Sequence, residues 1–248
     1  MGFHALMYHE IREKDSFDAT KPSPILVNQP YKDALPVKLF SDLTDFKAQM
    51  DFLEQENYYT LSLQEVKNYY QKGKKLPEKS VLLTFDDAYQ SVYKYAYPIL
   101  QQKNFHAVCF VVKSWLFEQI QEFKPSQSVV MAKKELEKMK DVFELANHTT
   151  NLHQRYPDGS TEMQKVSEGK LKKDLKDCGQ YVDYADIFAY PFGVYRQADV
   201  KRLAQLNIQY AFTTVPGENM RQTPVLTLHR DTIWYGCTLS EFKALLRK

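Results

Sequence analysis

Two adjacent carboxylates, Asp86 and Asp87, stand at the end of an apolar run that is typical of a buried strand, residues 80–85. Capping of the helix that follows explains one of them, because Asp is a preferred N-cap residue. The other then remains as an extra charge beside the core. Successive side chains of a strand point to opposite faces, so both carboxylates reach one site only where the strand ends and turns. The pair therefore indicates a chemical site in which the two carboxylates have separate roles.

Two histidines follow a second short apolar run, residues 143–147. His148 and His153 are five residues apart. Imidazole is the commonest metal-binding side chain at neutral pH, although a pair of loop histidines alone is weak evidence. Combined with a carboxylate from another strand end, the pair forms a three-ligand set typical of Zn²⁺ or a similar divalent ion. Such a site keeps positions open for water and substrate.

Two further strand ends carry groups of interest. Residues 187–193 run into the turn Tyr190-Pro191-Phe192-Gly193, and residues 226–230 place His229 at the end of a last strand. The ordinary interpretation is that residues 190–193 form a loop at the end of the barrel and that His229 has a structural role. The turn would also present a backbone N–H toward the site formed by the other strand ends, as an oxyanion donor does.

The elements that must position these groups alternate along the chain. Ser41 or Asp42 is placed to cap the first helix. We expect strands at 3–8, 58–61, 80–85, 106–112, 143–147, 186–190, 209–214 and 225–229, and helices at about 42–56, 63–72, 89–103, 132–140, 162–181, 197–206 and 239–247. The alternation predicts an α/β fold: a single distorted barrel of seven or eight parallel strands with helices outside. No linker is visible, so we predict one domain, residues 1–248.

Two long connections interrupt this alternation, residues 12–38 and 113–131. Loops of this length inside a compact domain are usually functional or mobile. Both follow a strand, so in a parallel barrel they would overhang the carboxyl ends of the strands, where active sites are built.

Composition narrows the function classes. The 248 residues carry 33 Lys+Arg and 31 Asp+Glu, a net charge of +2, which argues against a nucleic-acid partner. The hydrophobic fraction of 44% excludes intrinsic disorder. No apolar run approaches the ~20 residues that span a bilayer. Three cysteines, an odd number, make a disulfide framework improbable. The N-terminus has no signal-peptide pattern, which fits a cytoplasmic protein or a secreted one without its targeting segment.

The four motifs, in this order, resemble those of the polysaccharide deacetylases, carbohydrate esterase family 4, which share the NodB-homology domain. The resemblance covers nearly the whole chain and includes Leu6-Met7-Tyr8-His9 near its start. It is greatest to the branch that removes N-acetyl groups from biofilm poly-β-1,6-N-acetyl-D-glucosamine. That branch also spaces its histidines by five and has the sequence found here at residues 189–193.

The resemblance implies a role for each group. Asp86 matches the general base, the peptide N–H of Phe192 the oxyanion donor and His229 the proton donor, with return of the proton from Asp86 as the alternative. One divalent ion, Zn²⁺ with Co²⁺ or Ni²⁺ as alternatives, would be held by Asp87, His148 and His153. Three aromatic residues would contact sugar rings, although ordinary packing explains each of them equally well: Tyr190, Tyr195 and Trp234.

The chain departs from the family pattern at two positions. Thr227 stands where a Leu usually precedes the last histidine, and Ala189 stands where an Arg often orients the base. The expected partner is an N-acetylglucosamine-containing polysaccharide, and the expected protein is an extracellular or cell-surface monomer. The alternatives are a peptidoglycan or chitooligosaccharide N-deacetylase, a xylan O-acetyl esterase, and a sugar-binding pseudoenzyme of the same fold.

Overall fold

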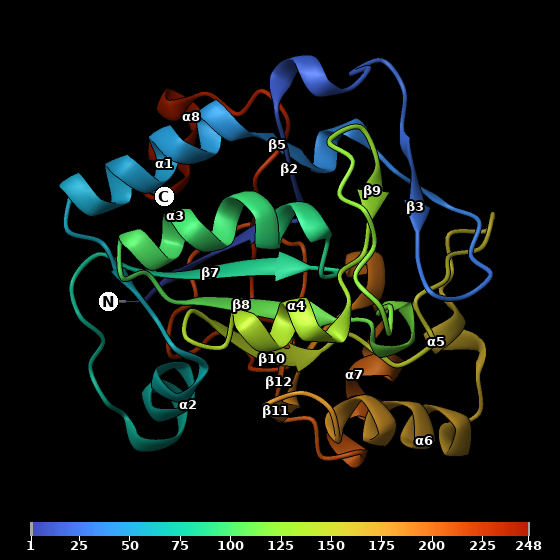
Figure 1. Cartoon of the computed structure of the whole chain (residues 1–248). Coiled ribbons are helices and arrows are strands. Elements are labelled where there is room, and N and C mark those ends of the chain that lie inside the picture. The colour runs from blue at the N-terminus through green and yellow to red at the C-terminus, as the bar shows by residue number, and fades with distance from the viewer. Residues whose placement is uncertain (1, 248) are drawn as a thin grey trace.

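A parallel sheet forms the centre of the protein in the computed structural model, which describes residues 2–247 (Figure 1). Seven strands follow the order β12-β11-β10-β8-β7-β1-β13, and all neighbours in it are parallel. The strands are β1 (His4–Tyr8), β7 (Ser80–Asp86), β8 (Ala107–Val111), β10 (Phe143–Asn147), β11 (Tyr184–Ala189), β12 (Tyr210–Phe212) and β13 (Asp231–Thr232); the short β6 (Tyr59–Thr60) also pairs with β7. The predicted α/β fold is confirmed as a curled half-barrel.

Residues 225–232 nearly close the curl. Ala211 N–H donates to the Val225 carbonyl and Thr213 N–H to the Leu228 carbonyl, both at 2.8 Å. The chain then continues into β13, which pairs with β1 through Leu6 and Asp231. The strand predicted at 225–229 is therefore displaced, because this segment crosses from β12 to β1 and forms only an isolated bridge on the way.

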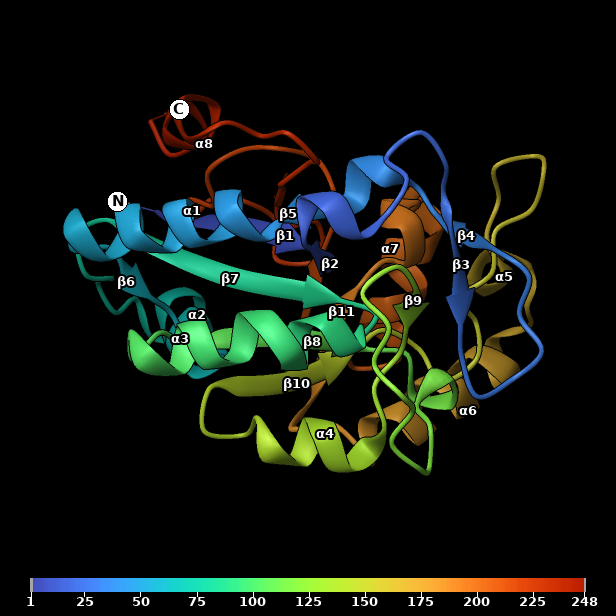
Figure 2. The ribbon, with the colours of Figure 1, turned by 45° about the horizontal axis from the view of Figure 1, so that its top comes forward.

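Helices surround the sheet (Figures 1 and 2). They are α1 (Leu43–Gln55), α2 (Leu63–Lys72), α3 (Tyr97–Gln102), α4 (Lys133–Lys138), α5 (Glu162–Lys165), α6 (Glu168–Gly179), α7 (Gln197–Gln205) and α8 (Leu239–Leu245). Asp42 caps α1 by accepting the Thr44 N–H at 2.8 Å, as the sequence indicated. Single 3₁₀ turns lie at Lys14–Ser16, Val37–Leu39, Lys113–Trp115 and Pro191–Gly193.

The helix predicted over 89–103 is shorter and irregular. A π-helical segment, Val92–Ala96, precedes α3. Pro98 lies inside the predicted range and has no N–H to donate, so regular bonding is interrupted one turn before it. None of the helices in residues 2–247 combines the length and apolar character needed to cross a membrane.

The side chains of β7 alternate between the core outside the barrel and the barrel interior. Leu83 and Phe85 point outward, and the Phe85 ring packs 5.2 Å from Tyr8 and 5.4 Å from Phe143. Leu82 belongs to a separate cluster on the opposite face. Because side chains alternate along a strand, Asp86 shares the face of Leu82 and points into the barrel.

The two long connections contain strands that the sequence analysis did not predict. They form a three-stranded sheet of β3 (Ser23–Leu26), β4 (Ala34–Leu35) and β9 (Ser128–Val129). The first connection is flanked by two further short strands, β2 (Glu10–Arg12) and β5 (Phe40–Asp42), which pair with each other. We call the sheet β4-β3-β9 the roof. It lies beyond the carboxyl ends of β7, β8 and β10 (Figure 2).

Candidate metal centre and active site

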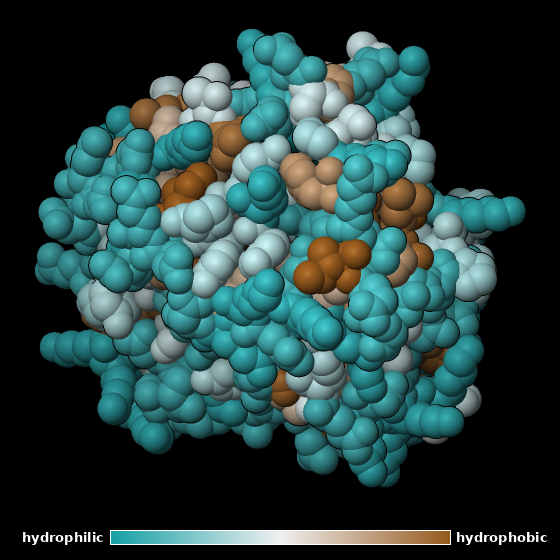
Figure 3. Space-filling view, in the orientation of Figure 1, coloured by the Kyte–Doolittle hydropathy of each residue, from teal (hydrophilic) through white to brown (hydrophobic). Residues whose placement is uncertain are grey.

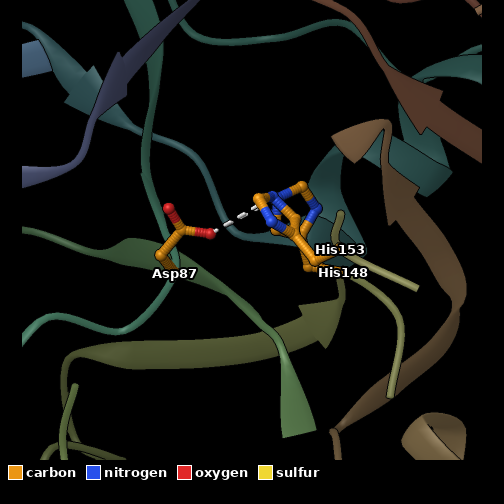
Figure 4. A group of neighbouring side chains, drawn as sticks. All are labelled: Asp87, His148 and His153. Atoms are coloured by element: carbon orange, nitrogen blue, oxygen red, sulfur yellow. Dashed lines mark ion pairs between the residues drawn. The ribbon is translucent and has the colours of Figure 1, made fainter. Parts of the chain in front are cut away.

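Asp87, His148 and His153 converge from two strand ends (Figure 4). All three are buried, and one ligand atom from each lies within 4.8 Å of the others. Asp87 Oδ1 is 3.7 Å from His148 Nε2 and 3.5 Å from His153 Nε2. That oxygen has no hydrogen-bond partner among the described residues. A buried carboxylate oxygen without a donor is costly, and a cation between the three atoms would satisfy it, so the residues fit a divalent ion.

The electrostatics of these groups agree with that assignment. Burial, with the nearby charge of Asp86, raises the pKa of Asp87 well above its usual range. Burial lowers the pKa of His148 and of His153, so both imidazoles are neutral at pH 7. Neutral imidazole is the form that offers a lone pair to a metal, and a cation would supply the charge that keeps Asp87 ionised.

The rings of the two histidines are oriented by different means. His148 Nδ1 lies 2.8 Å from the Ala189 carbonyl oxygen, so Nδ1 carries the proton and Nε2 is left free to bind an ion. The ring of His153 lies between aromatic rings, 4.7 Å from Trp115 and 4.3 Å from Phe192. Packing therefore holds the second ligand.

An unusual turn brings both carboxylates to one cavity. Asp87 and Ala88 have φ of 72° and 58°, in the left-handed region that costs a residue with a side chain roughly 1–2 kcal/mol. Asp87 N–H donates to the Phe110 carbonyl at 3.0 Å, and Met131 N–H donates to the Ala88 carbonyl at 2.9 Å. These bonds hold the turn, and Asp87 enters the cavity beside Asp86 instead of pointing to the opposite face.

Asp86 is held by Arg230, a residue to which the sequence analysis gave no role. Arg230 Nη1 donates to Asp86 Oδ1 at 2.6 Å and Nη2 donates to Oδ2 at 2.9 Å, with the guanidinium fully buried. Burial alone would raise the pKa of Asp86, but the charge of Arg230 and its hydrogen bonds lower it to about 2. Arg230 thus supplies the guanidinium that Ala189 lacks. The sequence could have indicated Arg230, because this residue directly follows the last predicted strand, residues 225–229.

A cavity of about 440 Å³ joins these groups. Besides Asp86 and the three ligands, its lining includes Phe192 and Trp234, two residues predicted to act or bind there. Phe192 and Gly193 have φ of 59° and 68°. A Cβ at Gly193 would lie 2.2 Å from Thr214 Oγ1, so the turn requires glycine at this position.

Three predicted site residues do not line this cavity. His229 is absent from the lining, and its neighbour Arg230 extends to Asp86, so the proton-donor role of His229 stays a prediction. Tyr190 is fully buried, and its hydroxyl donates to the Leu226 carbonyl at 3.0 Å. Tyr195 stacks on Tyr190 at 5.0 Å. The two tyrosines pack against each other and do not reach the cavity.

His9 is the second residue that the sequence analysis left without a role. It follows β1, is buried and lines the cavity. Its Nδ1 has no hydrogen-bond partner in the described part of the chain. Burial lowers the pKa of His9 to about 4, against the opposing effect of the Asp86 charge. The sequence could have indicated His9, because this polar residue directly follows an apolar strand, as His148 does and as Asp86 does at the end of its strand.

The chain belongs to the polysaccharide deacetylase family, whose sequence profile matches residues 73–211. The poly-β-1,6-N-acetyl-D-glucosamine N-deacetylase of Staphylococcus epidermidis is 28% identical over 218 residues, which cover 84% of this chain and 71% of the relative. The enzyme of the same name from Staphylococcus aureus strain N315 is 27% identical over 200 residues, with 76% and 67% covered. The predicted family is confirmed.

Among solved structures, the Streptococcus pyogenes deacetylase PplD in complex with acetate superposes with a TM-score of 0.77. The alignment covers 99% of this chain and 98% of that one at 22% identity. These values show a shared deacetylase fold.

Metal content separates the roles of the two carboxylates. We expect purified protein to bind about one divalent ion per chain, Asp87→Ala to lose it and Asp86→Asn to keep it, because only Asp87 faces both histidines. Asp86→Asn should lower kcat about 10²- to 10⁴-fold, the usual contribution of a general base. Atomic spectroscopy and acetate release measure the two effects. Unchanged metal content in Asp87→Ala would reject the ligand set.

Arg230→Lys tests the support of the base. Lysine keeps the positive charge but cannot hold both carboxylate oxygens at once, so Asp86 loses its fixed orientation. We expect kcat to fall roughly 10- to 100-fold, since misplacement of a catalytic group has effects of this size. The metal content should stay near that of the wild type. A wild-type kcat in this variant would show that the paired geometry is unimportant.

Proposed function

We propose that this protein hydrolyses the N-acetyl groups of poly-β-1,6-N-acetyl-D-glucosamine with the help of one divalent ion, Zn²⁺ in the first place and Co²⁺ or Ni²⁺ as alternatives. The observation that carries the proposal is the joining of two functions in one cavity: an ionised Asp86 held by Arg230, and a three-ligand set with an unpartnered carboxylate oxygen. The staphylococcal relatives named for this polymer and the five-residue spacing of the histidines support the substrate.

The reaction divides among residues already described. Asp87, His148 and His153 would hold a divalent ion, which would supply Lewis acidity toward the acetamide oxygen and toward water. Asp86 takes the proton of the attacking water, since its carboxylate is ionised and fixed. The peptide N–H of Phe192 donates to the oxygen on which negative charge develops. No covalent bond between the acetyl group and the protein is required.

The amine must then leave with a proton, and we propose that this proton comes from Asp86. Asp86 holds the proton taken from water, and His9 lines the same cavity with an unpartnered nitrogen. His9 is neutral at rest because its pKa is about 4, so it acts as a relay that receives this proton and passes it to the leaving nitrogen. His229 does not line the cavity, so we assign it no part in this step.

The polymer is found outside the membrane, so we propose an extracellular or cell-surface location. A glycan of this kind carries no charge before deacetylation, which suits a protein with a net charge of +2. We propose that the protein acts as a monomer. Trp234, which is half-buried in the cavity wall, is the aromatic residue we assign to sugar contact.

Acetate release from paired oligomers tests the substrate. With Zn²⁺, Co²⁺ or Ni²⁺ added, we expect β-1,6-linked N-acetylglucosamine oligomers to react at least about tenfold faster than β-1,4-linked ones of equal length, as judged by kcat/KM. A preference for the β-1,4 series would indicate a chitooligosaccharide or peptidoglycan enzyme. Acetate release from acetylated xylan alone would indicate an esterase, and no release with any of these substrates would indicate a sugar-binding pseudoenzyme.

A matched pair of histidine variants tests the proton route. His9→Ala should lower kcat roughly 10²-fold with metal content retained, because the relay is removed while the ligands stay in place. His229→Ala should change kcat by less than about threefold, since that ring lies outside the cavity. The reverse ranking of the two variants would restore His229 as the proton donor.

A further inference from the structure

A further buried ion pair joins Arg12 to Glu10. Both side chains are about 1% exposed, and Arg12 Nε lies 3.0 Å from Glu10 Oε1. The guanidinium also lies over the rings of Phe17 and Phe40, at 5.5 and 5.0 Å from their centres. Nothing in the proposed reaction uses this pair, although it sits immediately after His9 in the sequence.

The remaining bonds of the pair all reach the two long connections. Arg12 Nη1 donates to the Pro125 carbonyl at 2.6 Å, while Nη2 donates to Ser23 Oγ at 3.2 Å and to Ser128 Oγ at 3.0 Å. Ser128 Oγ donates in turn to Glu10 Oε2 at 2.5 Å. Ser23 begins β3 and Ser128 begins β9, so the pair bonds to two of the three strands of the roof.

The roof forms one wall of the catalytic cavity. Ile25 of β3, Leu35 of β4 and Asp33 between these strands line the cavity together with the metal ligands. Ile25 and Leu35 are buried, whereas Leu26, which alternates with Ile25, is 42% exposed. The roof therefore presents its inner face to whatever occupies the cavity, and its height above Asp86 decides how much room remains.

Stability alone does not explain the ion pair. Removing two charges from water costs more than their attraction commonly returns, and apolar side chains of similar volume often stabilise a protein as well or better. Apolar side chains cannot provide directional bonds, whereas the Arg12 guanidinium donates to three oxygen atoms, those of Ser23, Pro125 and Ser128. The ion pair lies where two strands of the roof, β3 and β9, are joined to the residues that follow β1.

We propose that Arg12 and Glu10 are positioning residues for the active site, which hold the roof over the cavity and so set how tightly the glycan chain binds. The statement about glycan binding rests on the proposed function. The statement that the ion pair holds the roof does not depend on it. The metal ligands and Asp86 come from strand ends of the barrel and none from the roof, so a displaced roof should weaken glycan binding more than it slows the chemical step.

The test replaces both partners at once, Glu10→Leu with Arg12→Met, because removal of one alone would leave an unpaired buried charge. We expect the double variant to fold and to bind about one metal ion. Its KM for β-1,6-linked oligomers should rise about tenfold or more with kcat changed less than about threefold. Hydrogen exchange of amides in residues 23–36 should become faster than in the wild type, as expected for a segment that opens locally.

Arg221→Met is the matched control. Arg221 also bonds three backbone carbonyls, those of Tyr69, Gly73 and Lys74, but it does not line the cavity. This variant should leave KM and the exchange of residues 23–36 unchanged. Equal KM in the double variant and the wild type would overturn the proposal, as would unchanged exchange of the roof. A wild-type protein without deacetylase activity would reject the proposed function alone, while the exchange measurement would still decide whether the pair holds the roof.

Discussion

The ion pair between Asp86 and Arg230 links the closure of the barrel to its chemistry. Arg230 lies in the segment that crosses from β12 to β1, and its N–H donates to the Val215 carbonyl at 2.9 Å while its side chain spans the barrel to β7. The same contact therefore joins the two sides of the curled sheet and keeps a buried carboxylate ionised. Without that guanidinium, burial would favour the protonated form of Asp86, which could not act as a base.

Four of the eight non-glycine residues with positive φ in residues 2–247 lie at the strand ends that carry the site. They are Asp87 and Ala88 after β7, Thr149 after β10 and Phe192 near the end of β11. Such conformations persist only where the surroundings enforce them. Each turn redirects the chain just as a functional side chain or its neighbour is placed, and the hydrogen bonds of the surrounding loops hold the turns. Thr149, for example, donates its N–H to Asn147 Oδ1 at 2.9 Å.

Much of this arrangement could be predicted from the sequence because it depends on local patterns. Apolar runs mark the strands of a parallel sheet, and the polar residue after each run marks the edge where those strands end together. Asp86, Asp87, His148 and His153 were found by that rule, and His9 satisfies it as well. The rule works because the carboxyl ends of parallel strands meet at the same edge.

The parts that could not be predicted depend on contacts between distant segments. Arg230 is 144 residues from Asp86, and nothing local shows which side of the chain faces the barrel. His229 and Arg230 are neighbours, so the choice between them depended on the register of an irregular segment. The roof was equally hidden, because its strands of two to four residues are stabilised by pairing between the two long connections and carry no periodic pattern.

Charge balance gives a reason why the base needs its own cation. A divalent ion beside two ionised carboxylates would leave the site neutral, and both histidines are uncharged. Arg230 compensates Asp86, so a divalent ion bound by Asp87 and the histidines would keep one net positive charge. Hydrolysis of an amide develops one negative charge on the carbonyl oxygen, and a fixed charge of opposite sign in a buried cavity stabilises it strongly. The buried guanidinium thus serves the proposed reaction twice, by keeping the base ionised and by leaving the metal site one positive charge for the transition state.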